Sequence, residues 1–386
     1  MTDKRLEKAI EALEEGKPLE AVQMLESLAQ SDEDDADVLV YLGIAYVQSE
    51  MPEKAVEVLQ RADDLIEEHS VVSMFLGHAL RILGRYEEAE DELRRAIRLD
   101  PGQPEPWVDL ARTFYSMNEY GGAVCFLEDA VEKFPQNREM RGLLALSLYR
   151  LGDFTTGAEQ WAELLRLEPD LMSAISNYAY LMLIQNRPCD AEPFVGKAVT
   201  LAPNDYRSLI LLGELRFQSG DHEGARECFL KALEDDPENV EALARLGVLA
   251  HHLRQPNLVH QYLEKAEAAV SEETGSWRCL CYAYLETGQT RNFLDCLVRW
   301  SESDPGAAAP WVELAVEYDK QGLLEHSRNA WRNVFELRRY VKIACSECHT
   351  CAKKTYDSEA GFDIYADIVC PKCGALIKMP FGLSKV

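Results

Sequence analysis

Two consecutive stretches of 34 residues decide the fold: ADVLVYLGIAYVQSEMPEKAVEVLQRADDLIEEH at 36–69 and SVVSMFLGHALRILGRYEEAEDELRRAIRLDPGQ at 70–103. Both carry a Leu-Gly pair at their seventh and eighth positions, alanine at the twentieth and leucine at the twenty-fourth. A fixed period of this length is the signature of a stacked helical repeat. The same register continues without insertion or deletion through ten units, which start at residues 2, 36, 70, 104, 138, 172, 206, 240, 274 and 308.

Three columns of this alignment indicate that each unit forms two helices. The eighth position holds only small residues, such as Gly43, Ala111 and Cys281, so two helices can touch there. Glycine recurs at the fifteenth position, as at Gly84, where a left-handed residue ends a helix. Proline recurs at the thirty-second position, as at Pro101, and stops the second helix before the next unit begins. We therefore predict helix, turn, helix, turn in every unit.

This pattern resembles the tetratricopeptide repeat, and the resemblance covers residues 2–341. It implies an all-α superhelical solenoid of about ten units, in which each unit buries its apolar face against its neighbours and the first helices line the concave side. The remaining residues, 342–386, have a different composition. For them we predict a small β zinc ribbon, so the domains are the repeat array and a metal-binding tail.

The resemblance also indicates where a partner binds, because ligands of this family usually meet the second, fifth, ninth, twelfth and thirteenth positions of the first helices, of which the fifth, ninth and twelfth form one stripe. In the middle units this stripe is largely aliphatic and aromatic, and an exposed apolar stripe usually marks a binding surface. We interpret it as a groove for an apolar or amphipathic protein segment, with tyrosines and a phenylalanine as anchors. The candidate groove residues are Val40, Ile44, Val47, Met74, Arg81, Arg112, Tyr115, Leu146, Tyr149, Tyr180, Leu183, Ile210 and Phe217. In the alternative interpretation, these side chains contact their own neighbours in a tightly wound superhelix.

Five cysteines crowd into the last 47 residues and suggest a metal site. Two Cys-x-x-Cys pairs, each after an alternating β-type stretch, have the spacing of a tetrahedral zinc site. We predict Cys345, Cys348, Cys370 and Cys373 as ligands, with Cys351 as a possible substitute in the first pair. The bound metal is predicted to be zinc, and iron in a rubredoxin-like site would use the same four sulfurs.

Charge and composition narrow the partner class. The formal net charge is −27, and the tail, with six lysines and five acidic residues, contributes none of this surplus. An acidic array disfavours nucleic acid and anionic membranes as partners. The sequence shows neither a signal-peptide core nor an apolar run long enough to span a membrane, which favours the cytoplasm.

The function that fits these features is a non-enzymatic scaffold or adaptor. No phosphate-binding loop, dinucleotide fingerprint or nucleophile elbow occurs in the sequence. The repeat groove is expected to bind a protein or peptide, with the ribbon as a cap or a second contact. The alternative is a regulator that contacts nucleic acid, or the transcription or translation machinery, through the ribbon.

Overall fold

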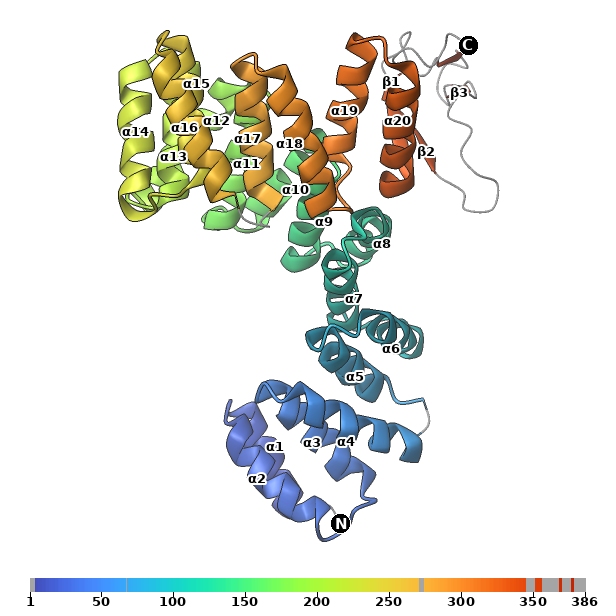
Figure 1. Ribbon diagram of the computed structural model, residues 1–386. Helices are drawn as coiled ribbons and strands as arrows, with labels where there is room; N and C mark the ends of the chain where they lie inside the picture. The colour runs from blue at the N-terminus through green and yellow to red at the C-terminus, as the bar shows by residue number, and fades with distance from the viewer. Residues whose placement is uncertain are drawn as a thin grey trace. The chain divides into compact units, whose positions relative to one another are not determined.

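The computed structural model describes residues 4–66, 68–270, 274–344, 351–355, 368–369 and 376–377. Within these ranges the chain forms twenty α-helices in ten consecutive pairs, which confirms the all-α repeat architecture (Figure 1). The helices are α1 Lys4–Glu14, α2 Pro18–Ala29, α3 Ala36–Gln48, α4 Pro52–Leu65, α5 Ser70–Ile82, α6 Tyr86–Leu99, α7 Glu105–Ser116, α8 Tyr120–Lys133, α9 Arg138–Arg150, α10 Phe154–Leu167, α11 Met172–Ile184, α12 Pro188–Leu201, α13 Tyr206–Gln218, α14 His222–Asp235, α15 Val240–His252, α16 Pro256–Ala269, α17 Thr274–Glu286, α18 Thr290–Ser303, α19 Ala309–Lys320 and α20 Leu324–Arg338. In the described part of the chain, no helix combines the length and apolar character that a membrane crossing requires.

The turn inside each pair has one conformation in all ten repeats. The fifteenth position always has a positive φ, between 73° and 84° where it is glycine, as at Gly84 and Gly220. Where the residue is not glycine, as at Glu50 and Arg254, φ is 56° to 58°. The left-handed backbone needed to end the first helix is therefore adopted even where the side chain disfavours it.

The small-residue column is where the two helices of a pair touch. A Cβ atom added at Gly213 would lie 2.5 Å from the ring of Phe229, and one at Gly247 would lie 2.7 Å from the side chain of Leu263. Both distances are too short for real carbon contacts. The close helix contact predicted at the eighth column is thus confirmed, and the structure shows that the twenty-fourth column forms its other side.

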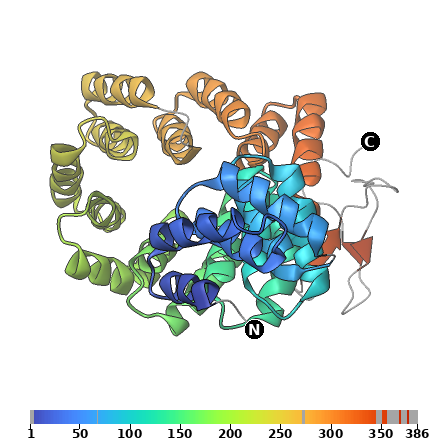
Figure 2. The same ribbon diagram turned by 90° about the horizontal axis from the view of Figure 1, so that it is seen from below.

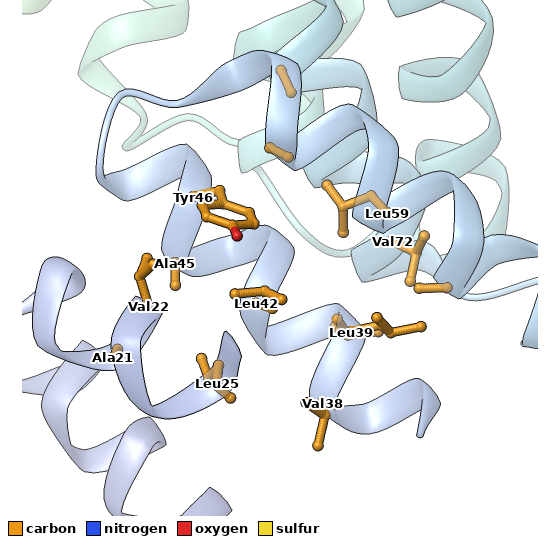
Figure 3. Packing of buried hydrophobic residues seen from close by; sticks show 14 of the residues in the cluster. Ala21, Val22, Leu25, Val38, Leu39, Leu42, Ala45, Tyr46, Leu59 and Val72 are labelled. Carbon is orange, nitrogen blue, oxygen red and sulfur yellow. The ribbon is translucent and has the colours of Figure 1, made fainter. Parts of the chain in front are cut away.

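The core runs from repeat to repeat rather than lying at one centre. In Figure 3, Leu25 of α2, Leu42 of α3, Leu59 of α4 and Val72 of α5 belong to one apolar cluster. Each exposes 3% or less of its surface. Each helix pair therefore covers an apolar face of the next, which is the basis of solenoid stability.

By its internal contacts the chain divides into an N-terminal unit (residues 1–117 and 126–143) and a C-terminal unit (residues 118–125 and 144–386). In the C-terminal unit the helix pairs follow one another around a curve (Figure 2). Asp304 accepts hydrogen bonds from Tyr120 and Arg150, both at 3.2 Å. Arg338 donates a 2.8 Å bond to the carbonyl of Leu151. The curvature thus brings the first and last repeats of this unit into contact.

Short strands follow the last helix. Strand β1 (Tyr340–Ala344) pairs antiparallel with β2 (Cys351–Thr355), and β3 (Ile368–Val369) pairs antiparallel with β4 (Leu376–Ile377). In the first pair Ala344 lies opposite Cys351. The predicted metal ligands Cys345, Cys348, Cys370 and Cys373 lie outside the described residues, and Cys351 is described by its backbone alone.

Candidate functional site

The N-terminal unit contains a cavity of about 360 Å³ that its first helices α3, α5, α7 and α9 line together. We call it the N-terminal pocket. Its lining residues are Val47, Met74, Phe75, His78, Pro104, Glu105, Val108, Asp109, Arg112, Asn137 and Glu139. Three of the predicted groove residues, Val47, Met74 and Arg112, are among them. The volume lies in the range of small-molecule and side-chain sites.

Helix geometry explains why these side chains share one face. Met74 and His78 are four residues apart on α5, and Val108 and Arg112 are four apart on α7, a spacing that stacks side chains one turn above another. The result is an apolar wall with a polar end. Such a combination can take an apolar side chain of a partner and orient its polar backbone or neighbours.

The polar end of the pocket is organised by the buried carboxylate of Asp109. Nδ1 of His78 lies 2.6 Å from Oδ2, while Arg112 and Arg81 approach Oδ1 at 3.2 Å and 3.5 Å. Burial by itself raises the pKa of Asp109, but the hydrogen bond with His78 and the charges of His78 and the two arginines outweigh it and hold the pKa below its usual value. Asp109 therefore stays ionised near neutral pH.

Arg112 links this network to the rim of the pocket. Its guanidinium also pairs with Glu139 of α9. The side chain of Arg112 is 38% exposed, against 9% for Asp109 and 18% for Arg81. Arg112 is thus the basic group of the network with the freest access to a partner.

The other candidates in the N-terminal unit are less available. Ile44 is half-buried against the apolar core, and Tyr115 is half-buried. Val40 exposes only 7% of its surface. The prediction that Val40 faces a partner is corrected here, because this position is turned into the packing between repeats.

In the C-terminal unit the predicted aromatic anchors surround an arginine of the same chain. The guanidinium carbon of Arg278 on α17 lies 4.7 to 5.8 Å from the ring centroids of Tyr149, Phe154, Tyr180 and Tyr282. Its Nη1 atom donates a 2.7 Å hydrogen bond to the hydroxyl of Tyr180. Only 6% of Arg278 is exposed. We call this arrangement the arginine cage.

The arginine cage decides between the two interpretations of the aromatic stripe for Tyr149 and Tyr180. Their rings are engaged by Arg278, 98 residues beyond Tyr180, so here the chain contacts itself across the inner face of its own curve. Burial raises the pKa of Tyr180 well above its usual value, with the charge of Arg278 opposing this effect, so the hydroxyl stays protonated. These two tyrosines are not free anchors for a partner.

The remaining candidates of the C-terminal unit also make internal contacts. Leu183 and Ile210 expose 1% and 3% of their surface and are corrected from groove residues to core residues. Leu146 is half-buried against the same cluster as Leu183. Phe217 packs edge-on against His252, and the centroids of the two rings are 5.0 Å apart.

A polar network extends along the first helices of the C-terminal unit. Arg245 of α15 bridges Glu214 of α13 at 3.2 Å and Glu286 of α17 at 3.1 Å. Burial raises the pKa of the neighbouring Glu241, with Arg245 opposing the rise. Arg245 thus joins three successive first helices of this unit.

Some residues of these sites were not found from the sequence. Asp109 occupies the sixth position of its unit, which the ligand-facing columns omit. Arg278 and Tyr282 occupy the fifth and ninth positions of the ninth unit. Continuing the same columns to that unit would have identified them. Phe154 opens a second helix, and no column singled it out.

Comparison with known proteins identifies the repeat. Residues 12–76 and 80–147 match a family model described as tetratricopeptide repeat, and residues 213–253 match one described as TPR repeat. Among solved structures, the C-terminal part of a TPR repeat-containing protein from Cytophaga hutchinsonii has a TM-score of 0.53 at 15% identity, covering 61% of this chain and 97% of that one. The chain therefore carries tetratricopeptide repeats and has their helical solenoid fold.

Sequence relatives are distant, and each match covers only part of the relative. The chain is 28% identical over 124 residues to the protein O-mannosyl-transferase Tmtc3 of Drosophila melanogaster, which is 32% of this chain and 13% of the relative. It is 23% identical to the DnaJ homolog subfamily C member 7 homolog of Schizosaccharomyces pombe, over 60% of this chain and 42% of the relative. It is 20% identical to the BBSome complex member BBS4 homolog of Drosophila melanogaster, over 66% and 54% of the two chains. The chain thus matches only a part of each of these relatives.

Proposed function

We propose that this protein is a non-enzymatic scaffold whose N-terminal pocket holds an amphipathic segment of a protein partner. The observation that carries the proposal is the pocket itself, which successive repeats build from the ligand-facing columns of their first helices. Tetratricopeptide repeats form extended surfaces of this kind. The inner face of the C-terminal unit, by comparison, is engaged by Arg278 and by the bridges of Arg245.

The lining of the pocket indicates the chemistry of the partner. Val47, Met74 and Phe75, which are only partly buried, form an apolar wall that suits one or two aliphatic or aromatic side chains. Glu105 stands among the lining residues, Glu139 is paired with Arg112, and the chain carries a net charge of −27. The carboxylate of Glu105 and the acidic net charge favour a basic residue beside the apolar anchor of the partner.

The proposal excludes an enzymatic role and places the protein in the cytoplasm. The similarity to the O-mannosyl-transferase is confined to 13% of that protein, so no transferase activity is carried over. In the N-terminal pocket His78 pairs with Asp109 and Arg112 pairs with Glu139, so these polar groups are held in place for recognition of a partner.

The pocket is tested with peptides selected from a random dodecamer display library against the full chain. Isothermal titration calorimetry then compares the wild type with Met74→Ala and Arg112→Ala. Loss of a pocket anchor is expected to weaken binding about tenfold or more. Glu87→Ala, at an exposed position of α6, is the matched control and leaves binding unchanged. Selected peptides that bind both pocket variants as tightly as the wild type would overturn the proposal.

We further propose that the tail binds one zinc ion through Cys345, Cys348, Cys370 and Cys373. The arrangement of the strands supports this, since one Cys-x-x-Cys pair falls between the antiparallel strands β1 and β2 and the other between β3 and β4. Turns between paired strands are where zinc knuckles offer two sulfurs to one ion. The ribbon would then serve as a cap or a second contact surface.

Metal analysis of the purified chain by mass spectrometry tests the tail. About one zinc per chain is expected in the wild type and in Cys351→Ser, and much less in Cys370→Ser. One iron per chain with the same dependence would assign a rubredoxin-like site instead. Loss of the metal in Cys351→Ser would show that the first pair of ligands is Cys348 and Cys351. A wild-type chain that contains no metal would refute the site. A tail that binds RNA or DNA in a salt-dependent way would favour the nucleic-acid alternative.

A further inference from the structure

Two buried cysteines face each other in the ninth repeat. Cys281 on α17 occupies the small-residue column, at which the two helices of a repeat touch. Cys296 on α18 lies one residue before the bulky twenty-fourth column. Their Sγ atoms are 2.7 Å apart. A disulfide bond is about 2.05 Å long, so the two sulfurs already lie close to bonding distance.

A small cavity gives access to one member of this pair. Cys296 lines a cavity of about 70 Å³ together with Trp277, Asn292, Asp295 and Arg299. A cavity needs only about 10 to 15 Å³ on this measure to admit one water molecule. Hydrogen peroxide, which is about the size of two water molecules, fits into this space, whereas Cys281 is fully buried behind it.

We propose that Cys281 and Cys296 form a redox-switched disulfide, with hydrogen peroxide as the oxidant. In the first step the sulfur of Cys296 attacks one peroxide oxygen, the O–O bond breaks, and the released hydroxide takes up the thiol proton and leaves as water. Cys296 is then a sulfenic acid. In the second step the sulfur of Cys281 attacks Cys296 Sγ, the S–O bond breaks, and the hydroxyl group leaves with the proton of Cys281 as a second water.

The balance is two thiols oxidised to one disulfide and one peroxide reduced to two waters. Burial raises the pKa of Cys281, and its position behind Cys296, away from the cavity, makes it the second sulfur to react. A thiol pool such as glutathione reverses the reaction by thiol–disulfide exchange. Because Arg278 lies on the same helix as Cys281, oxidation ties the helix that fills the arginine cage to α18.

The experiment maps cross-links in the full chain. The protein is treated with hydrogen peroxide, quenched, unfolded in the presence of N-ethylmaleimide and digested without reductant. We expect a linked pair of peptides carrying Cys281 and Cys296, lighter by about 2 Da than the two free peptides together and released by dithiothreitol. The exposed thiol of Cys189 reports that the peroxide dose was sufficient.

Two variants make the result specific. Cys281→Ala places at this column the alanine that other repeats carry there. Because the second sulfur is then missing, we expect Cys296 to stop at the sulfenic acid, which dimedone traps. Cys228→Ala is the matched control, because Cys228 holds the same column as Cys296, and the small-residue column of its repeat holds Gly213 instead of a cysteine. It should leave the cross-link unchanged. Alkylated Cys281 and Cys296 at a dose that oxidises Cys189 would overturn the proposal, and so would oxidation of Cys296 to a sulfinic acid while Cys281 stays free.

Discussion

Removing the guanidinium from the arginine cage is expected to loosen the C-terminal unit. Arg278 joins α17 to α9, α10 and α11, which lie three or more repeats earlier in the chain. In Arg278→Ala four ring contacts and the 2.7 Å bond to Tyr180 are lost together. The buried charge disappears with them, and the neighbouring Glu241 keeps Arg245 as a counter-charge.

The size of the effect follows from these contacts. A desolvated cation–π arrangement contributes about 2 kcal/mol, and a hydrogen bond from a charged donor about 1.5–3 kcal/mol. The cost of burying the guanidinium offsets part of this sum. We therefore expect Arg278→Ala to lower the free energy of unfolding by about 2–4 kcal/mol. The hydrogen bond alone should give a coupling energy of about 1–2 kcal/mol with Tyr180→Phe.

Urea unfolding, followed by circular dichroism, measures the loss of stability and the coupling energy in a double-mutant cycle. The cycle compares the wild type, the two single variants and the double variant, and the dependence of the unfolding free energy on urea concentration is taken as the same for all four. Arg207 and Tyr206 form the matched control. They make the same kinds of contact, a cation over a ring at 5.7 Å and a 2.9 Å hydrogen bond, but both residues are exposed. Their coupling should stay below about 0.5 kcal/mol. Equal coupling in the two cycles would show that burial in the cage adds nothing and would refute this reasoning.

Three further predictions concern the repeats. Glu50→Gly and Arg254→Gly should each raise the free energy of unfolding by about 0.5–1 kcal/mol, because glycine relieves the left-handed backbone there; a lower urea midpoint would contradict this. Gly213→Ala should cost about 1–3 kcal/mol through the clash with its neighbouring helix, whereas Gly196→Ala on α12, with open space around it, should stabilise by up to about 1 kcal/mol in the same assay. The lowered pKa of Asp109 contributes stability that is fully present above its usual value of 3.8 and is lost as the pH falls through the lower folded value. Acid titration by circular dichroism should therefore find a shallower loss of stability below pH 3.8 in Asp109→Asn, and parallel curves would count against the ion-pair network.

Most of the helical architecture could be predicted because every repeat places a given column in the same local environment. The small residue at Gly213 and the bulky one at Phe229 meet in one contact, and the glycine of the first turn has its left-handed φ. The candidate groove could be predicted only in part. Val47, Met74 and Arg112 do line the N-terminal pocket. Other members of the same columns are buried, because a column records the position on a helix and not how far the neighbouring repeat covers it.

The sequence by itself determined the helix pairs, their turns and the columns through which they pack, since these depend on contacts within a repeat and between adjacent repeats. Only the tertiary structure decided which ligand-facing side chains are free. Arg278 reaches Tyr180 from 98 residues away because small rotations between successive pairs add up until the curve returns on itself. The 34-residue sequence pattern does not specify the size of the rotation between successive pairs, so it does not predict their sum. The contact between the members of the arginine cage therefore could not be found from the repeat pattern, although all of them except Phe154 stand in ligand-facing columns.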